Sequence, residues 1–363
     1  MANRRIFWAI QGVAMGNMGA VSVNNTAINS SYRSTTLLNP VMGLQSVGIT
    51  TNFNLEQAFQ LGQLALYENI EEVPDVEITM EKVIDGAPML YHLATSTVGG
   101  AVGVNGTLVG RSNERADVRL GIWNDTAERA AGTGNTLEAE VYCSGMYLSS
   151  LSYTFPTDGN CTESITMVGN HKEWTHATDS ASAWASTTDY GFVGNLAGPT
   201  AAPSGVQRRE NVDVVNSTFP AEVRMSNADG GLNATPASRK VHINSISMSC
   251  DLGREEIREL GRKGPYFRYV TFPIEVTCDF EVTATSGDFI QALEEGDNLS
   301  DRQITIKLDD VTTFNLGSKN KLSSITYGGG DTGGGNSTVT FSYSTFNDFK
   351  VTNPNTDPAL KTA

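Results

Sequence analysis

Apolar and polar residues alternate along many short runs of this chain, and a period of two predicts β-strands. The run from Ile274 to Thr283 shows the pattern best. One side of it is apolar and the other is acidic or hydroxyl-bearing: Ile274, Val276, Cys278, Phe280 and Val282 against Glu275, Thr277, Asp279, Glu281 and Thr283. We therefore expect a strand with one buried face and one wet, acidic face.

Two further runs have the same form. The first sets Val76, Ile78 and Met80 against Asp75, Glu77, Thr79 and Glu81. The second sets Leu137, Ala139, Val141 and Cys143 against Glu138, Glu140 and Tyr142. Shorter alternating runs predict strands at 118–123, 241–250 and 304–309. Residues 146–155 and 164–168 form one predicted hairpin, and residues 322–327 and 337–343, which flank a glycine tract, form another.

Helical signals are few. Residues 254–260 are charged and end at Gly261, which predicts a helical turn, and a basic and aromatic connector, residues 262–269, follows it. Asp85-Gly86 predicts a turn, after which Pro88 begins a short helix that extends to Ala94. Ser286 or Asp288 can cap another short helix after the strand at 274–283. Residues 55–66 fit either a helix or strands with a bulge.

These elements predict a mainly β fold of two packed antiparallel sheets with a flanking short helix. At 363 residues the chain can hold two or three average domains, but all-β folds often run longer as single units. We favour one domain over residues 1–363, with an N-terminal arm or loop at 1–45 and an inserted surface region at 171–239.

The formal charge of −15 argues against a surface that grips nucleic acid, because phosphate binding depends on Lys and Arg. The negative charge is still compatible with a surface past which DNA slides, because negative groups repel the phosphate backbone. No run approaches the roughly eighteen apolar residues of a membrane span. Arg4 and Arg5 precede an apolar run that Gln11 interrupts, which does not favour export.

Catalytic and metal-binding motifs are weak in this sequence. The four cysteines, at 143, 161, 250 and 278, lack zinc spacing, and we interpret them as buried thiols, with disulfides left open. His171 and His176, with Cys161 or Asp179 nearby, have no recognised metal-ligand spacing. The glycine tract at 328–335 lacks the Lys-Ser/Thr ending of a phosphate loop. We expect no cofactor, no metal and no catalytic residues.

The acidic strand faces have two interpretations. Identical subunits joined edge to edge could close into a ring, and the acidic faces would then line it and let a polyanion pass without sticking. The alternative is an acidic outer surface that keeps the protein soluble and needs no partner. The residues alone favour the second interpretation.

Two stretches resemble bacteriophage tail tube proteins, particularly those of contractile-tailed phages: FQLGQLALYENIEEVPDVEITMEKVIDG (59–86) and ELGRKGPYFRYVTFPIEVTCDFEVTATSGD (259–288). The resemblance covers roughly residues 40–95 and 240–350, with weaker support at 137–168. It implies a tail-tube β-sandwich or barrel that assembles into hexameric rings, which stack into a hollow tube for double-stranded DNA. The region at 171–239 and the glycine-rich hairpin depart from a compact version of this family.

The resemblance also implies roles for particular residues. The candidates for the channel wall are Asp75, Glu77, Glu81, Glu275, Thr277, Asp279 and Glu281. The candidates for contact with a neighbouring subunit are Arg262, Lys263, Tyr266, Phe267 and Arg268, because Tyr, Phe and Arg favour interfaces. The same connector could instead be a loop that packs on its own subunit. The implied partners are copies of the chain, a tail sheath, baseplate or tail-terminator proteins, and DNA in passage.

By this likeness the protein is a non-enzymatic virion component of the tail, assembled in the host cytoplasm. One rival is another virion structural protein, such as a capsid decoration or an adhesin, which predicts a monomer or trimer. The other is a carbohydrate-active β-sandwich enzyme, which predicts a cleft where two carboxylates converge and one titrates abnormally.

Overall fold

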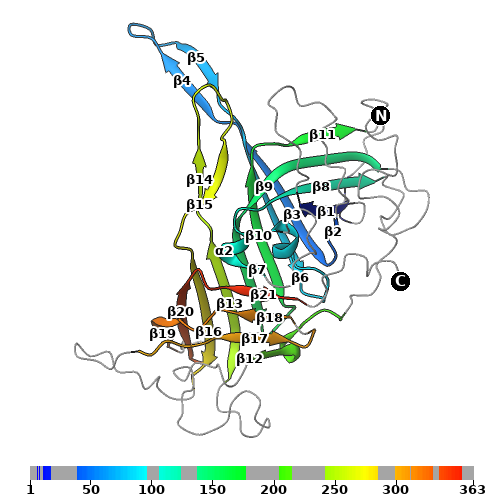
Figure 1. Ribbon diagram of the computed structural model, residues 1–363, viewed down its shortest axis with the longest axis vertical. Coiled ribbons are helices and arrows are strands. Elements are labelled where there is room, and N and C mark those ends of the chain that lie inside the picture. Colours follow the sequence, from blue (N-terminus) through cyan, green and yellow to red (C-terminus); the bar gives the residue numbers. More distant parts are fainter. Residues whose placement is uncertain are drawn as a thin grey trace.

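A computed structural model of the chain describes Ile6, Trp8 and residues 11–17, 39–95, 106–123, 137–176, 204–214, 242–284, 299–310, 312–329 and 335–353. These residues form a mainly β protein with several antiparallel sheets and few short helices (Figure 1). The predicted fold class is therefore confirmed.

A twelve-stranded sheet forms the body of the molecule. Its main path runs β19–β20–β16–β13–β9–β10–β6–β3, with antiparallel pairing throughout. The strands of this path are β3 Leu44–Asn52, β6 Asp75–Val83, β9 Leu137–Pro156, β10 Thr162–Gly169, β13 Ile243–Asp251, β16 Glu275–Thr283, β19 Lys321–Gly328 and β20 Thr338–Phe346. The strands that join it off this path are β1 Gln11–Asn17, β2 Asn39–Pro40, β8 Arg115–Trp123 and β11 Glu173–His176.

A five-stranded sheet of order β12–β17–β18–β21–β7 packs against the body. Its strands are β7 Gly106–Thr107, β12 Val212–Val214, β17 Thr305–Leu308, β18 Thr313–Asn315 and β21 Lys350–Thr352. The ring of Phe314 in β18 lies 4.7 Å from that of Tyr153 and 5.4 Å from that of Phe155, both in β9. These contacts confirm two packed sheets. The described strands form no closed barrel.

The core lies between the two sheets, and the alternation of the strands fills it. In β16 every second side chain is buried, Phe280 completely, and in β20 Phe341 and Tyr343 are also completely buried. Lys82 in β6 is buried on this side as well, and its Nζ lies 2.6 Å from Oδ1 of Asp85. All four cysteines are free and buried, as expected.

Short helices flank the sheets. The structure confirms the turn at Gly86, whose φ is +81°, and the helix α1, Leu90–Ala94, which follows it. The buried Glu163 of β10 accepts hydrogen bonds from the backbone N–H groups of Leu90 and Tyr91, at 2.6 and 3.0 Å. A strand residue thus caps α1, whose own N-cap residue makes no side-chain hydrogen bond. The remaining helical elements are α2 Leu108–Arg111 and the 3-10 turn η3 Arg209–Asn211.

The predicted helical turn at 254–260 is wrong. Residues 254–257 form the strand β14, Arg254–Ile257, which pairs with β15, Phe267–Val270, as a two-stranded sheet. The residues at 55–66, for which a helix or bulged strands were both open, form strands. These are β4, Leu55–Phe59, and β5, Leu66–Glu71, with a register shift between Ala58 and Phe59.

The prediction for the third acidic run, residues 137–143, is correct for the strand and wrong for its polar face. Residues 137–143 do begin the strand β9, but Glu140 and Tyr142 are buried rather than wet. Arg119 in the neighbouring β8 explains this, because its Nε lies 3.4 Å from Oε1 of Glu140 and its guanidinium lies over the Tyr142 ring. A buried carboxylate needs such a partner, and a single strand sequence does not show it.

Several expectations fall outside the described residues: the helix expected after Ser286 or Asp288, most of the arm at 1–45, most of the region at 171–239, and the side chains of His176 and Asp179. Within the described part of 171–239, β12 belongs to the five-stranded sheet. Among the described residues, no helix is both long and apolar enough to cross a bilayer.

Candidate functional site: a polar sheet face and two hairpins

The face of the large sheet that points away from the core is mainly polar, with Phe346 exposed on it beside Glu275. Residues that pair directly across antiparallel strands point to the same face, so the strand registers define rows on it. One row crosses from β20 to β3 through Ser344, Thr277, Ser249, Ser152, Ser164, Glu81 and Ser46. The next row contains Ser342, Asp279, Ser247, Thr154 and Thr162.

Carboxylates and hydroxyl groups make up most of this face, and the exposed Lys321 of the edge strand β19, opposite Ser344, lies beside them. In the strands of the path from β3 to β20, the only basic residue is Lys82, which is buried in the core. Neighbouring polar side chains bind one another: Ser249 Oγ lies 2.8 Å from Thr277 Oγ1, and Ser245 Oγ donates to Glu281 at 3.2 Å. A surface of this kind holds water, and between β3 and β20 it offers a phosphate group no cation.

Sequence alternation alone could not show that β6 and β16 turn their acidic sides the same way, and the structure shows that they do. Glu77, Glu81, Glu275, Asp279 and Glu281 lie on the same face, together with Thr277, with β13, β9 and β10 between the two strands. Six of the seven candidates for a channel wall are therefore neighbours on one surface.

Asp75, the seventh candidate, sits in a different environment at the start of β6. Its carboxylate accepts hydrogen bonds from Asn54 at 2.8 Å, from Arg268 at 2.7 Å and from Asn170 at 3.1 Å. Partial burial acts to raise the pKa of Asp75, but the hydrogen bonds from Asn54, Arg268 and Asn170 and the charge of Arg268 outweigh it. The pKa of this carboxyl is therefore lower than usual, and the group is bound within its own subunit.

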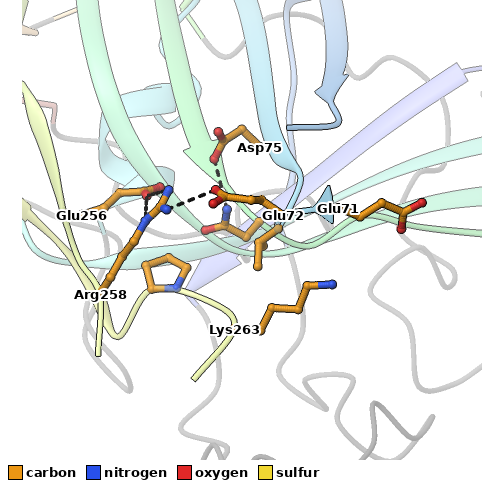
Figure 2. Close-up of a pocket in the computed structure, with 9 residues that line it drawn as sticks. Glu71, Glu72, Asp75, Glu256, Arg258 and Lys263 are labelled. Carbon is orange, nitrogen blue, oxygen red and sulfur yellow. Dashed lines mark hydrogen bonds and ion pairs between the residues drawn. The ribbon is translucent and has the colours of Figure 1, made fainter. Parts of the chain in front are cut away.

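Two hairpins project from the same end of the molecule (Figure 1). The β4–β5 hairpin extends farthest, and the β14–β15 hairpin lies below it. Ion pairs link the β14–β15 hairpin to Glu72 at the end of β5 and to Asp75 at the start of β6: Arg258 lies 3.2 Å from Glu72 and 3.2 Å from Glu256, and Arg268 forms ion pairs with Glu256 and Asp75. Figure 2 shows Arg258 between the carboxylates of Glu256 and Glu72.

The body contacts the β14–β15 hairpin at both ends of its ladder. Phe267 packs edge-on against Tyr147, with ring centroids 5.2 Å apart, and Arg254 donates to the carbonyl oxygens of Leu148 and Ser112 at 2.7 and 2.6 Å. Among the five candidates for subunit contact, Phe267 and Arg268 therefore contact their own chain. Arg262, Lys263 and Tyr266 lie nearer the tip, where Tyr266 and Lys263 are exposed and Arg262 lies over the Tyr266 ring.

A small pocket opens between the base of the β4–β5 hairpin and the tip loop of the β14–β15 hairpin (Figure 2). Its volume is about 140 Å³, below the range of roughly 300–1,000 Å³ that is typical of small-molecule sites. Its lining is mostly charged, with Glu71, Glu72, Asp75, Glu256, Arg258 and Lys263 among its residues. The described residues contain no cluster of His, Cys, Asp and Glu that could hold a metal ion. The pocket is thus a small, charged gap between the two hairpins.

Two parts of this site escaped the sequence analysis. The hydroxyl rows on β9, β13 and β20 have a signal in the sequence, since Ser or Thr recurs at every second position over 150–154, 245–249 and 340–344. The exposed apolar residues of the β4–β5 hairpin have no such signal in the sequence, because an apolar side chain is normally expected to be buried by its own chain.

No family model matches the chain, and no curated protein matches it either. Among solved structures, the chain is similar to one described as the cryo-EM structure of the anti-feeding prophage baseplate, 6-fold symmetrised. The identity is 10% and the TM-score 0.32, and the alignment covers 49% of this chain and 99% of that chain. So distant a likeness assigns no role to the chain, and the surfaces described above support the proposals that follow.

Proposed function

We propose that this chain is a structural subunit of a bacteriophage tail tube. Copies of it join as hexameric rings, the rings stack into a hollow conduit, and double-stranded DNA passes through the conduit to the host. The supporting observation is the polar face from β3 to β20, which presents carboxylates and hydroxyl groups without basic residues, with Lys321 of the edge strand β19 beside it. The tail tube resemblance of residues 59–86 and 259–288 supplies the architecture of the proposal.

The mechanism is electrostatic and mechanical. A lining with negative charge repels the DNA backbone, and hydroxyl groups keep the lining hydrated, so the DNA finds no binding site along its path. The two-sheet core behind the lining gives it stiffness. The channel wall in this proposal consists of Glu77, Glu81, Glu275, Thr277, Asp279 and Glu281, with Asp75 at its margin.

The sheet edges offer a means of joining copies. β3 and β19 end the main path of the described sheet, and each keeps apolar residues only partly buried: Val47 and Ile49 in β3, Ile325 in β19. Pairing between copies would remove these edges and cover these side chains. A sheath and baseplate or terminator proteins would then surround the tube of a contractile tail, which forms in the host cytoplasm and remains in the virion.

The first test is electron microscopy of the purified protein, for which we expect rings or hollow tubes. Discrete monomers or trimers would contradict the proposal and favour a decoration protein or an adhesin. Globules that cleave glycans would favour the enzyme.

The second test reverses the lining. Glu275→Lys, Asp279→Lys and Glu281→Lys together should still permit assembly but slow or stall genome delivery, measured as release of DNA from reconstituted virions. The matched control reverses three exposed carboxylates outside the polar face, Asp158, Glu210 and Asp309, and should deliver DNA at the normal rate. Equal delivery by both variants would show that this face does not line the channel.

A further inference from the structure

The two hairpins hold most of the apolar surface that the molecule exposes. Of twenty large apolar side chains that are exposed in the described part of the chain, eight lie in residues 53–72 and five in residues 254–272. Leu61 and Leu64, at the tip of β4–β5, are fully exposed, and Leu55, Phe59 and Leu66 share one face of that hairpin. A two-stranded ribbon is marginally stable alone, and exposed apolar patches mark interaction sites.

The β4–β5 hairpin is also acidic throughout. Residues 53–72 contain Glu56, Glu68, Glu71 and Glu72 and no Lys, Arg or His. Glu72 at the base is paired with Arg258, but Glu56 and Glu68 are exposed and form no ion pair with any residue that the structure describes. Their registers place them as diagonal neighbours on one face, where like charges repel. A cationic partner would remove this repulsion.

The tip of the β14–β15 hairpin has the complementary character. Arg262 and Lys263 are adjacent there, and within the described part of the chain neither forms an ion pair. Leu260 is fully exposed beside them, and Tyr266, under the Arg262 guanidinium, is about half exposed. This tip therefore offers positive charge next to apolar and aromatic surface.

Both surfaces belong to one chain and lie at one end of it (Figure 1). The Arg258–Glu72 and Arg268–Asp75 ion pairs link the β14–β15 hairpin to the end of the β4–β5 hairpin that joins the body and to the start of β6. Two different complementary surfaces on one chain create a heterologous contact, which closes into a ring when the rotation permits. Because both are at the same end, copies that meet through them stand side by side and point the same way.

We propose that the β4–β5 hairpin of each copy docks on the β14–β15 tip of the next copy in the ring. Glu56 and Glu68 meet Arg262 and Lys263 of the neighbour, and the contact also covers Ile70, which lies on the same face as the two carboxylates, and Tyr266 of the neighbour. This inference rests on the proposed ring of identical copies and names the two surfaces through which neighbouring copies recognise each other.

A charge exchange between copies tests it. One variant carries Glu56→Lys and Glu68→Lys, a second carries Arg262→Glu and Lys263→Glu, and a third carries all four changes. Each of the first two places like charges together, and we expect it to need at least about tenfold more protein to assemble. An equimolar mixture of these two should assemble like the wild type, with the variants alternating in equal numbers, and so should the third variant alone.

Sedimentation velocity and electron microscopy measure assembly, and circular dichroism shows that each variant is folded. Rescue in the four-change variant but not in the mixture would place the contact within one chain and overturn the proposal. Tubes that form normally from both charge-reversed variants would overturn the hairpin contact and leave the tube itself standing. A wild-type protein that never self-associates would contradict both proposals.

Discussion

The sheet body and the projecting hairpins share an alternating strand pattern, but their apolar side chains are buried in the body and exposed in the hairpins. Both consist of antiparallel strands with apolar residues at regular positions. In β16 the apolar side chains are buried against the second sheet, whereas in β4 and β5 they are exposed to solvent. The alternation of apolar and polar residues therefore shows which face of a strand is apolar. It does not show whether the same chain or another molecule buries that face.

The charged groups of the two regions differ in the same way. In the body, Lys82 and Asp85 lie 2.6 Å apart and almost no solvent reaches them. Between the hairpins, Arg258 and Glu72 lie 3.2 Å apart and both are substantially exposed. A buried pair is strongly required once it forms, because removal of one partner leaves a charge without compensation, whereas an exposed pair contributes little. Buried groups therefore stabilise the body, whereas the ion pair between the hairpins is exposed and weak.

The largest expected effect comes from one substitution made in both regions. Phe314→Ala removes a completely buried ring between Tyr153 and Phe155, and should lower the free energy of unfolding by about 3–5 kcal/mol. Phe59→Ala removes a ring that is 65% exposed, and the free energy of unfolding of the isolated subunit should change by no more than about 0.5 kcal/mol. Urea unfolding of the unassembled protein measures both.

The contrast between a packed body and an uncovered hairpin would be wrong if Phe59→Ala destabilised the isolated subunit as much as Phe314→Ala does. That outcome would mean that the hairpin packs on its own chain. A milder core change, Ile78→Val, serves as the calibration and should cost about 0.5–1.5 kcal/mol.

The second prediction concerns pH, because α1 in the body holds a buried histidine and neither hairpin contains one. Burial lowers the pKa of His92 to about 4, although the hydrogen bond of its Nε2 to the carbonyl of Val351, at 3.1 Å, acts the other way. The unfolded chain binds this proton near pH 6.5 and the folded chain only near pH 4. The contribution of neutral His92 to stability is therefore complete above pH 6.5 and is lost as the pH falls to about 4, by about 3 kcal/mol in total.

His92→Gln isolates this effect, because an amide side chain can still donate a hydrogen bond but does not titrate. The free energy of unfolding of the variant, measured between pH 4 and 7, should lack the part of the slope that is due to His92. An unchanged slope in the variant would assign the acid sensitivity to other groups. The buried carboxyls do not imitate it, since burial raises the pKa of Glu163 and of Asp117, and a raised carboxyl pKa favours the folded state at lower pH.

Much of the body could be predicted from the sequence because the face of each residue in a strand follows from local alternation. The buried and polar sides of β6 and β16 were both assigned correctly in this way. Residues 254–260 were misassigned because their Glu, Arg and Leu residues favour helix, while pairing with β15, ten or more residues away, decides the matter. Glu140 was misassigned because its partner, Arg119, comes from another strand.

The candidate site depended even more on distant pairings. Each acidic strand side was visible in the sequence, but their union on one face follows from the order β16–β13–β9–β10–β6. The same holds for the hairpin tips. The residues of the connector were identified as interface candidates by type, yet only the structure separates Phe267 and Arg268, which contact their own chain, from Arg262, Lys263 and Tyr266 near the tip.

The smallest predicted effect tests how firmly the hairpins are held together. Glu72→Gln removes the ion pair with Arg258, and since both partners are exposed the midpoint of global unfolding should not move measurably. Backbone amides in β14 and β15 should nevertheless exchange with solvent faster, because the ion pair that links the end of β14 to Glu72 is lost while those of Arg268 with Asp75 and Glu256 remain. Hydrogen exchange with mass spectrometry measures this at low salt.

Salt provides the internal check, because screening should weaken the Arg258–Glu72 pair and bring the exchange rates of wild type and variant together. Asp158→Asn, which breaks an exposed pair of 3.9 Å with Arg209 on the body, should leave the hairpin amides unchanged. If Glu72→Gln instead lowers the stability of the whole subunit, the hairpins and the body unfold as one unit. The contrast between a self-sufficient body and hairpins that await a partner would then be wrong, and the apolar tips would have to be explained by the fold of the single chain.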